Sequence, residues 1–420
     1  MLIDGEFFYS NGILTCEDVC LREIAEEYGT PSYIYSKRAI LSRFRSYRHA
    51  LEGVSHKICF AVKANSNLAV LAMLAKEGAG FDIVSGGELY RVLAAGADPA
   101  SVVFSGVGKT EGEIRYAVES GIHSFNCESE AEITTISNAA SSLGKVASVA
   151  LRVNPDVDAV THPYISTGLR EHKFGVAMEE APSIYRRITA LPGIVPEGVS
   201  CHIGSQLLDP GPLMEAARKT IRLVDGLRAE GIAIRHLDLG GGIGVPYRPS
   251  DRRVYPADMI SQVRSLVAPL GVTLMLEPGR SIVAEAGMLL CRVTLTKHNG
   301  RKTFVVVDAG MNDLIRPALY QAHHEIIPVL RPETPGEAEV DVVGPVCETG
   351  DFFARGRSMP ELKAGDLVAI QTAGAYGFVL SSNYNSRPRA CELLVDGARV
   401  VVARQRESYA DLVRGEVTGF

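Results

Sequence analysis

Between residues 57 and 280, short apolar segments alternate with longer segments whose apolar residues recur every three or four positions. The short segments predict strands, and the longer ones predict amphipathic helices. The eight predicted strands are Lys57–Lys63, Gly80–Val84, Ser101–Ser105, Ile122–Asn126, Ala147–Val153, Glu197–Ile203, Arg235–Leu239 and Thr273–Glu277. Eight strands with helices between them predict a (β/α)8 TIM barrel, because a doubly wound open sheet would give fewer repeats over this length.

After Arg280, β-rich runs separated by Gly, Pro and Asn predict a second domain, a β-sandwich or small β-barrel. The runs are Ser281–Leu295, Thr303–Asp308, Glu339–Val343, Asp366–Ile370, Arg389–Leu394 and Val400–Ala403. Near the N-terminus, Asn11-Gly12 predicts a hairpin turn and Val19–Tyr28 an amphipathic helix, neither of which has a role in a barrel. We therefore expect a barrel of residues 31–280 and a discontinuous β domain of residues 1–30 and 281–420.

The composition excludes several kinds of partner. The chain of 420 residues has a net charge of -6, 46% hydrophobic and 22% charged residues, which is typical of a globular protein without a nucleic-acid footprint. It has neither an apolar run of about 18 residues nor a signal-peptide pattern, so we expect a cytoplasmic protein that does not enter a membrane. The eight cysteines form no Cys-x-x-Cys pair, and no metal site is expected.

Lys63 ends the first predicted barrel strand, and turn residues follow it at once. A lysine at a strand end can simply extend its amine to water. A desolvated amine at the mouth of a barrel, however, loses its proton more readily and suits a Schiff-base lysine. The other predicted strands also end in polar residues or glycine, at Asp82, Ser105, Asn126, Arg152, His202, Gly240 and Glu277. In barrel enzymes this rim holds the active site.

The glycine run Gly240–Gly242 follows a predicted strand and is typical of a backbone nest that binds phosphate, although a tight turn is the alternative. Its spacing does not match a dinucleotide fingerprint. The segment Gly106–Thr110 resembles a nucleotide P-loop, but the upstream glycine would fall at Val103, so ATP binding is not predicted.

Two further strand ends suggest a cofactor. His202 and Ser205 offer a flat ring and a hydroxyl beside the predicted phosphate nest. Glu277 could keep a cofactor nitrogen protonated, and Arg280, three residues on, could clamp a carboxylate or phosphate.

The predicted β domain contributes three more candidates. Cys347 lies between turn residues, which suggests an exposed thiol, and Tyr376 lies in a glycine-rich loop that could present its phenol to a phosphate. Asn312, Arg316 and Tyr320 are four residues apart and share one face if that segment is helical.

Taken together, these segments resemble the fold-type III pyridoxal-phosphate decarboxylases, and the diaminopimelate branch in particular. The Lys63 motif, the run Phe81–Leu89, His202–Ser205, Glu277–Arg280 and the Cys347 loop are shared across the family. More specific to the diaminopimelate branch are Thr161–Gly168, Lys173-Phe174-Gly175 and a glutamate, Glu348, directly after the cysteine. Phe60 and Thr349 stand where a tyrosine and a serine are common, and neither change affects the expected chemistry.

The resemblance implies that Lys63 binds pyridoxal 5'-phosphate covalently, His202 stacks on its ring and Glu277 pairs with its nitrogen. It implies that Asp82 and Arg152 support Lys63, and that Cys347 of a neighbouring subunit returns a proton, so that a homodimer shares its active sites. The implied cofactor-binding set is Lys63, Asp82, Arg152, His202, Ser205, Gly240, Gly241, Gly242, Glu277, Gly279, Arg280 and Tyr376. The implied substrate-binding set is Arg280, Arg316, Tyr320, Glu348 and Tyr376.

The reaction implied by the resemblance is decarboxylation of meso-2,6-diaminopimelate to L-lysine and CO2, the last step of lysine biosynthesis. The nearest alternative is a related decarboxylase acting on ornithine, carboxynorspermidine or a carrier-bound glutamate. An amino-acid racemase would need a second acid or base, normally a tyrosine, where this chain has the cysteine loop. A non-catalytic pyridoxal-phosphate carrier would need only the barrel.

Overall fold

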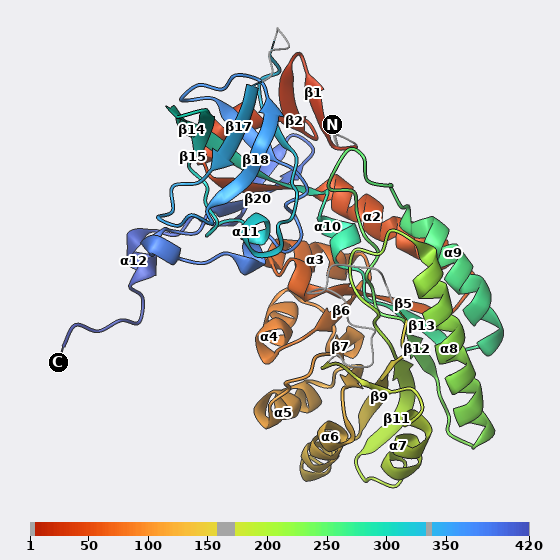
Figure 1. The fold of residues 1–420 in the computed structure, drawn as a ribbon. Coiled ribbons are helices and arrows are strands. Elements are labelled where there is room, and N and C mark those ends of the chain that lie inside the picture. The colour runs from red at the N-terminus through yellow and green to blue at the C-terminus, as the bar shows by residue number, and fades with distance from the viewer. Residues whose placement is uncertain (1–4, 158–172, 333–337, 420) are drawn as a thin grey trace. The chain divides into compact units, whose positions relative to one another are not determined.

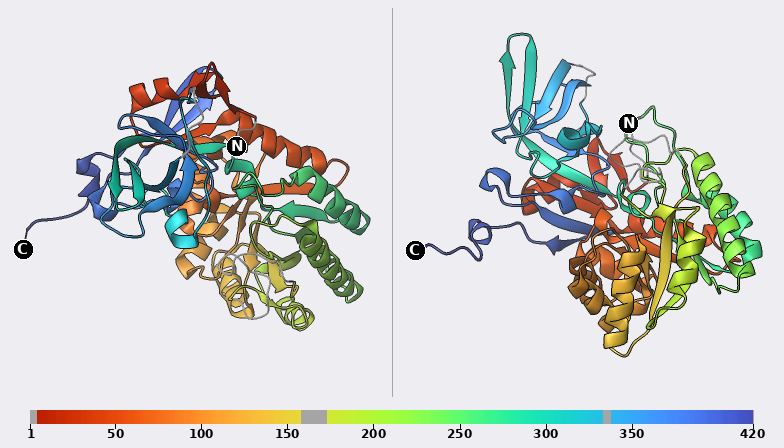
Figure 2. Two further views of the ribbon diagram at one scale, coloured as in Figure 1. Left: turned by 45° about the horizontal axis from the view of Figure 1, so that its top comes forward. Right: turned by 60° about the horizontal axis from the view of Figure 1, so that its bottom comes forward.

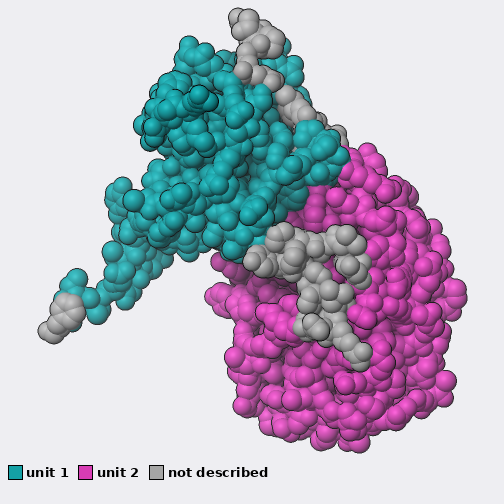
Figure 3. Space-filling model, viewed as in Figure 1, with its two compact units in different colours: residues 1–42, 246–251, 282–420 teal, residues 43–245, 252–281 magenta. Residues whose placement is uncertain are grey.

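The computed structural model describes residues 5–157, 173–332 and 338–419. The chain forms two compact units (Figure 3). The barrel unit consists of residues 43–245 and 252–281, and the sheet unit of residues 1–42, 246–251 and 282–420.

The barrel unit contains a closed sheet of eight parallel strands, which confirms the predicted (β/α)8 barrel. Neighbouring strands pair in chain order, and the pairing of β13 with β5 closes the ring. The strands are β5 (His56–Ala61), β6 (Gly80–Ile83), β7 (Val102–Phe104), β8 (Ser124–Cys127), β9 (Ala147–Asn154), β11 (Ile194–Ser200), β12 (His236–Asp238) and β13 (Thr273–Leu276). A short strand, β10 (Val176–Ala177), adds to β9 outside the ring.

A helix follows each barrel strand, and the helices lie around the outside of the ring (Figure 1). They are α3 (Leu68–Lys76), α4 (Gly86–Ala94), α5 (Glu111–Ser120), α6 (Glu130–Ser142), α7 (Ala181–Ile188), α8 (Pro210–Ala229), α9 (Pro256–Val267) and α10 (Arg280–Val283), with α2 (Lys37–Ala50) preceding β5. Ser85, Thr110 and Ser129 cap three successive helices by accepting a backbone hydrogen bond three residues on. These caps fix where each chain segment turns from strand to helix at the rim.

One predicted strand end is wrong in a way that matters for the site. β5 ends at Ala61, and Lys63 lies in a one-turn 3-10 helix, Val62–Ala64, rather than at the last strand position. The backbone N–H of Ala61 donates to the carbonyl of Pro278, and the chain turns after this contact. Lys63 therefore lies in the segment that follows β5, at the rim of the barrel.

The sheet unit is built on a nine-stranded sheet in the order β18-β17-β15-β14-β4-β20-β21, in which β19 pairs with β14 and β16 pairs with β19. The long strand β14 and its partner β15 form a hairpin that projects from this unit in the right-hand view of Figure 2. The strands are β4 (Ser32–Ser36), β14 (Gly287–Asn299), β15 (Lys302–Val307), β16 (Ile326–Pro328), β17 (Ala338–Val343), β18 (Phe352–Met359), β19 (Leu367–Ile370), β20 (Cys391–Asp396) and β21 (Arg399–Arg404). Two short helices, α11 (Arg316–Tyr320) and α12 (Tyr409–Leu412), complete this part.

The N-terminal segment belongs to the sheet unit. Asn11 and Gly12, both with positive φ, turn the hairpin of β1 (Phe7–Ser10) and β2 (Ile13–Cys16), which β3 (Val19–Cys20) and α1 (Leu21–Tyr28) follow. Their apolar side chains share one core with residues of β14 and β20. The burial of this apolar surface holds the segment to the sheet.

The units divide at different residues from those expected. β4 pairs with β14 and β20, so residues 31–42 belong to the sheet unit and not to the barrel. The segment 246–251 also belongs to the sheet unit, and Ser281–Val283 is helical rather than β. Across the described residues, no helix is both long and apolar enough to span a membrane.

Candidate active site

A cavity of about 410 Å³ opens at the rim of the barrel unit. Five of the eight predicted rim positions line it: Lys63, Ser105, Arg152, His202 and Glu277. Val84, Gly106–Gly108, Phe174, Ser200 and Cys201 complete its wall. A volume of this size suits a small aromatic ligand, and the side chains include an amine, an imidazole, a guanidinium and a carboxyl group.

Asp82 holds Lys63 in place. The Lys63 amine lies 2.8 Å from the Asp82 carboxylate, which is fully buried, while about a third of the lysine side chain stays exposed. A buried carboxylate that pairs with the amine orients it toward the cavity. The predicted support of Lys63 by Asp82 thus has a direct structural counterpart.

Glu88, near the start of α4, is a half-buried acid that the sequence analysis did not single out. Its carboxylate accepts a hydrogen bond from the backbone N–H of Val84 at 2.7 Å. Burial, with a smaller contribution from Asp82, raises the pKa of Glu88 to about 7. In the unfolded chain this carboxyl has its ordinary pKa of 4.5.

We expect Glu88→Gln to flatten the pH dependence of stability. Because the folded pKa of about 7 lies above the unfolded value of 4.5, the folded wild type binds the proton more tightly, and this stability is lost as pH rises through 7. Between about pH 4.5 and 8 the wild type should lose up to roughly 3 kcal/mol more unfolding free energy than the variant. Urea unfolding at both pH values measures this, with Glu119→Gln on the exposed face of α5 as control. An equal loss in Glu88→Gln would contradict the raised pKa of Glu88.

Glu277 lies in the floor of the cavity within a buried polar cluster. Its Oε1 accepts hydrogen bonds from Asn126 Nδ2 at 3.0 Å and Ser105 Oγ at 3.2 Å. Burial, followed by the charges of Asp238 and Asp82, raises the pKa of Glu277 well above its usual range, whereas Lys63 lowers it. A carboxyl group with a raised pKa can give its proton to a basic ring nitrogen that enters the cavity and then pair with the cation that results.

His202 offers a neutral ring to the cavity. Burial lowers the pKa of its imidazole well below the usual range, and the charges of Arg152 and Lys63 lower it further. The backbone N–H of Gly241 donates to His202 Nδ1 at 3.2 Å, which fixes the ring orientation. A neutral ring held in this way suits stacking on a flat ligand.

Arg152 pairs with a carboxylate that the sequence analysis did not single out. Its guanidinium forms a buried ion pair with Glu128 at 2.9 Å and lies 4.7 Å from the centre of the Phe174 ring. Glu128 also accepts the backbone N–H of Gly175 at 2.6 Å. Arg152 thus connects the cavity to the segment that begins at Lys173. Glu128 could not be identified from the sequence, because a carboxylate just before the helix cap Ser129 looks like an ordinary acid at a helix start.

The glycine run packs closely against the chain segment that contains Glu277. The Gly240 carbonyl accepts the backbone N–H of Glu277 at 2.8 Å, and φ is +67° at Gly240 and +96° at Gly242. A Cβ at Gly241 would overlap the carbonyl oxygen of Glu277. The run therefore needs glycine for its backbone conformation and for the close approach of two chain segments.

We expect Gly241→Ala to weaken cofactor binding by at least about tenfold, because its new methyl group pushes the glycine run away from Glu277. Titration of the apoprotein with pyridoxal phosphate, followed by fluorescence, measures the dissociation constant. Gly226→Ala in α8 is the matched control, since its Cβ meets no atom within 4 Å. An unchanged dissociation constant in Gly241→Ala would show that the glycine run takes no part in binding the cofactor.

Arg280 and Ser205 meet beside the glycine run. Arg280 is buried at the start of α10, and its guanidinium donates to Ser205 Oγ at 3.0 and 3.3 Å. A Cβ at Gly279 would approach the side chains of Ala64 and Ala61 to within 3.0 Å, so glycine lets this turn pack against the Lys63 segment. Both predicted residues thus lie where the rim segments converge.

Lys109 is a structural residue, which agrees with the rejection of the P-loop. Its amine donates to the carbonyls of Gly106 and Asn126 and to Glu132, at 2.8, 2.9 and 2.5 Å. These three bonds use all the N–H donors of an ammonium group. Lys109 therefore has no donor left for a phosphate.

The other predicted site residues lie in the sheet unit. Arg316 and Tyr320 share the short helix α11, but Asn312 lies before its start. Arg316 is buried, donates to His324 Nε2 at 2.9 Å and lies 4.6 Å from the centre of the Tyr247 ring. His324 Nδ1 in turn donates to the Gln371 carbonyl at 2.8 Å, so the imidazole orients the guanidinium.

Cys347 is exposed, as predicted, on a loop that folds around Asp351. The two Asp351 carboxylate oxygens accept the backbone N–H groups of Val346 and Met311, both at 2.6 Å. Glu348 Oε2 accepts the Tyr384 hydroxyl at 3.3 Å. The buried aspartate thus fixes the loop conformation while the thiol stays accessible.

Tyr376 has a φ of +55°, which is uncommon for a residue other than glycine and is often found at functional sites. The motif Thr161–Gly168 lies outside the described residues. The roles of Tyr376, Cys347, Glu348, Arg316 and Tyr320 in catalysis remain predictions.

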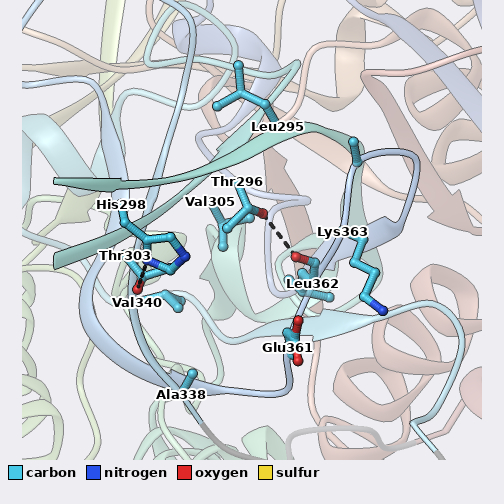
Figure 4. Close-up of a pocket in the computed structure, with 11 residues that line it drawn as sticks. Leu295, Thr296, His298, Thr303, Val305, Ala338, Val340, Glu361, Leu362 and Lys363 are labelled. Atoms are coloured by element: carbon cyan, nitrogen blue, oxygen red, sulfur yellow. Dashed lines mark hydrogen bonds between the residues drawn. The ribbon is translucent and has the colours of Figure 1, made fainter.

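A second cavity, of about 650 Å³, lies within the sheet unit between β14, β15, β17 and the segment 361–364 (Figure 4). His298 and Thr303 form a hydrogen bond of 3.0 Å across its wall, and Thr296 donates to the Leu362 carbonyl at 2.9 Å. None of the predicted site residues lines this cavity.

Comparison with known proteins agrees with this geometry. Residues 37–284 match the family model "Pyridoxal-dependent decarboxylase, pyridoxal binding domain". The chain therefore belongs to the pyridoxal-dependent decarboxylases, a class of carboxy-lyases.

More specific relatives are diaminopimelate decarboxylases. That of Pseudomonas aeruginosa is 54% identical over 410 residues, with 98% of each chain covered, and that of Vibrio cholerae is 50% identical, with 96% of this chain and 97% of the relative covered. The crystal structure of the M. jannaschii enzyme in complex with L-lysine is 37% identical, with a TM-score of 0.93 and 98% of each chain covered. That of the Helicobacter pylori enzyme with L-lysine is 44% identical, with a TM-score of 0.89, and covers 94% of this chain and 98% of that one. Within its class, the chain is a member of the diaminopimelate decarboxylase family.

Proposed function

We propose that the chain decarboxylates meso-2,6-diaminopimelate to L-lysine and CO2 with pyridoxal 5'-phosphate bound in the barrel cavity. The observation that carries the proposal is that Lys63, His202 and Glu277 line one cavity at the barrel rim. The relatives named above support this substrate rather than ornithine, carboxynorspermidine or carrier-bound glutamate.

The residues around the cavity fit such a cofactor. Arg152 Nε and Ser200 Oγ are buried polar atoms of the wall, and among the described residues neither has a hydrogen-bond partner. Buried polar atoms are normally hydrogen-bonded, so these atoms suit a site that receives a polar ligand. The glycine run contacts two residues of the cavity wall, His202 and Glu277. Together with Ser205 and Arg280, which contact one another, it offers donors that suit a phosphate group.

Each barrel residue has a distinct task in this proposal. Lys63 provides the amine that holds the cofactor, and Asp82 orients that amine. His202 covers one face of the ring, and Glu277 pairs with the ring nitrogen. The cofactor, once its nitrogen is held protonated by Glu277, supplies a ring that accepts the electrons left when CO2 departs. Gly240–Gly242, Ser205, Arg280 and Tyr376 bind the phosphate.

Residues of the sheet unit, together with Arg280 of the barrel unit, supply the groups that recognise the substrate. Arg280, Arg316 and Tyr320 bind the distal carboxylate, and Glu348 binds the distal ammonium group, since a zwitterionic group needs both a cation and an anion. Cys347 returns a proton to the substrate carbon from the partner subunit of a homodimer. The homodimer and a cytoplasmic location are part of this proposal.

Lysine formation tests the proposal. Purified protein supplied with pyridoxal phosphate should convert meso-diaminopimelate to lysine, because all the groups named above are present in the chain. Protein that binds the cofactor but forms no lysine would overturn the proposed substrate.

A further inference from the structure

Asp238, the last residue of β12, lies beneath the cavity and has no role in the function proposed above. Its side chain is almost fully buried, with 1% exposed. Oδ1 accepts a hydrogen bond from the backbone N–H of Gly240 at 2.8 Å. Oδ2 accepts one from Asn126 Nδ2 at 3.0 Å. The same Asn126 Nδ2 lies 3.0 Å from Glu277 Oε1, so one amide group faces both carboxyl groups, and each carboxyl acts on the pKa of the other.

The contact between Asp238 and Glu277 requires a proton. Two ionised carboxylates have no donor to offer one another, so one of the two must be protonated. Asn126 cannot donate a hydrogen bond to each of its neighbours, because its two N–H groups face three acceptors: Asp238, Glu277 and Ser105. We therefore expect the pair to hold one proton between its two carboxyl groups.

The charges around Asp238 and Glu277 are consistent with one proton held between the two carboxyl groups. Asp82 adds a third carboxylate and Lys63 adds one cation, while the buried thiol of Cys59 stays neutral. Burial raises the pKa of Asp238 as well as that of Glu277. Two buried carboxyl groups in contact cannot both ionise without strong repulsion.

We propose that Asp238 is a positioning residue that sets both ends of the cofactor site through one carboxyl group. This inference rests on the proposed cofactor site. One oxygen of Asp238 holds the amide of Gly240, where the phosphate-binding run begins. Through the shared proton, the same carboxyl group holds Glu277, which faces the ring nitrogen. The distance between the phosphate-binding and nitrogen-binding groups is therefore fixed by a single buried side chain.

Two variants separate the two contacts. Asp238→Asn keeps an oxygen that can accept from Gly240 but replaces the shared proton by an amide N–H. Asp238→Ala removes both contacts. Asp209→Asn is the matched control, because Asp209 Oδ1 accepts the backbone N–H of Gly211 at 2.7 Å with the same two-residue spacing, on the exposed start of α8.

The probes are pyridoxine 5'-phosphate, which has the ring and the phosphate but no aldehyde to bond to Lys63, and inorganic phosphate as its competitor. For Asp238→Ala we expect the affinity for both probes to fall by at least about tenfold in the folded protein. For Asp238→Asn we expect phosphate affinity within about threefold of wild type, but pyridoxine 5'-phosphate affinity reduced by about tenfold. Asp209→Asn should match the wild type with both probes.

The outcomes are distinguishable. If wild-type protein binds neither probe, the proposed cofactor site itself fails. If the wild type binds pyridoxine 5'-phosphate and folded Asp238→Ala binds it equally well, the cofactor site stands and the role of Asp238 is overturned. If Asp238→Asn loses both probes to the same degree, the carboxyl group does not act on the two ends separately, which also overturns the inference. Circular dichroism confirms folding before each titration.

Discussion

Replacement of Lys63 by alanine is expected to abolish lysine formation, with a loss of at least about a thousandfold in kcat. The physical reason is that Lys63 is the amine on the cavity wall that is held by a buried carboxylate, Asp82, at 2.8 Å. Without this amine the protein would lack the proposed covalent attachment of the cofactor. Borohydride reduction of the loaded wild type should leave the cofactor on the peptide that contains Lys63, and mass spectrometry detects it.

Lys63→Arg is the control for charge. The guanidinium can keep the ion pair with Asp82, but it is not a nucleophile at neutral pH because its pKa exceeds about 12. We therefore expect Lys63→Arg to fold as the wild type does, to lose activity as Lys63→Ala does, and to retain no cofactor after reduction. An active Lys63→Arg enzyme, or a reduced adduct on another lysine, would show that Lys63 is not the attachment site.

The second large effect is expected at Cys347. We expect Cys347→Ala to lose most of its activity while retaining the cofactor, because the exposed thiol is proposed to supply a proton after CO2 departs. Reduction with borohydride should still label Lys63 in this variant. Loss of activity with retention of the cofactor separates this role from that of Lys63.

A mixture of the two variants tests whether sites are shared between subunits. If Cys347 acts in the site of its neighbour, random exchange of Lys63→Ala and Cys347→Ala subunits gives heterodimers with one intact site, and activity recovers to about a quarter of wild type. If each site is built from one chain, the mixture remains inactive. Brief exposure to mild denaturant allows the subunits to exchange, and wild type treated in the same way is the control.

Much of the fold could be predicted from the sequence because each barrel strand is short, apolar and followed by an amphipathic helix. The ring of strands places the ends of distant segments together, so Lys63, His202 and Glu277 could be expected to meet. What the pattern does not contain is which sheet a strand joins. β4 is fully buried, as many residues of the barrel strands are, yet its backbone pairs with β14 and β20 of the sheet unit.

The supporting residues of the site could not be predicted for a related reason. Glu88, Glu128 and Asp238 are carboxylates beside a helix start or a glycine run, where acidic residues are common for local reasons. Only the packing shows that Asp238 touches Glu277 and that Glu128 pairs with Arg152. The sequence holds one local indication that Asp238 supports the site. This residue lies in a predicted strand and directly precedes the segment Leu239–Gly242.

The most direct test of the central claim is CO2 release from the purified protein with pyridoxal phosphate, measured with five substrates in parallel. They are meso-diaminopimelate, ornithine, lysine, arginine and carboxynorspermidine. We predict release from meso-diaminopimelate alone, with one lysine formed for each CO2. Release from another amine with none from meso-diaminopimelate would preserve the cofactor chemistry and contradict the proposed substrate, and release from none of them would contradict the proposed function.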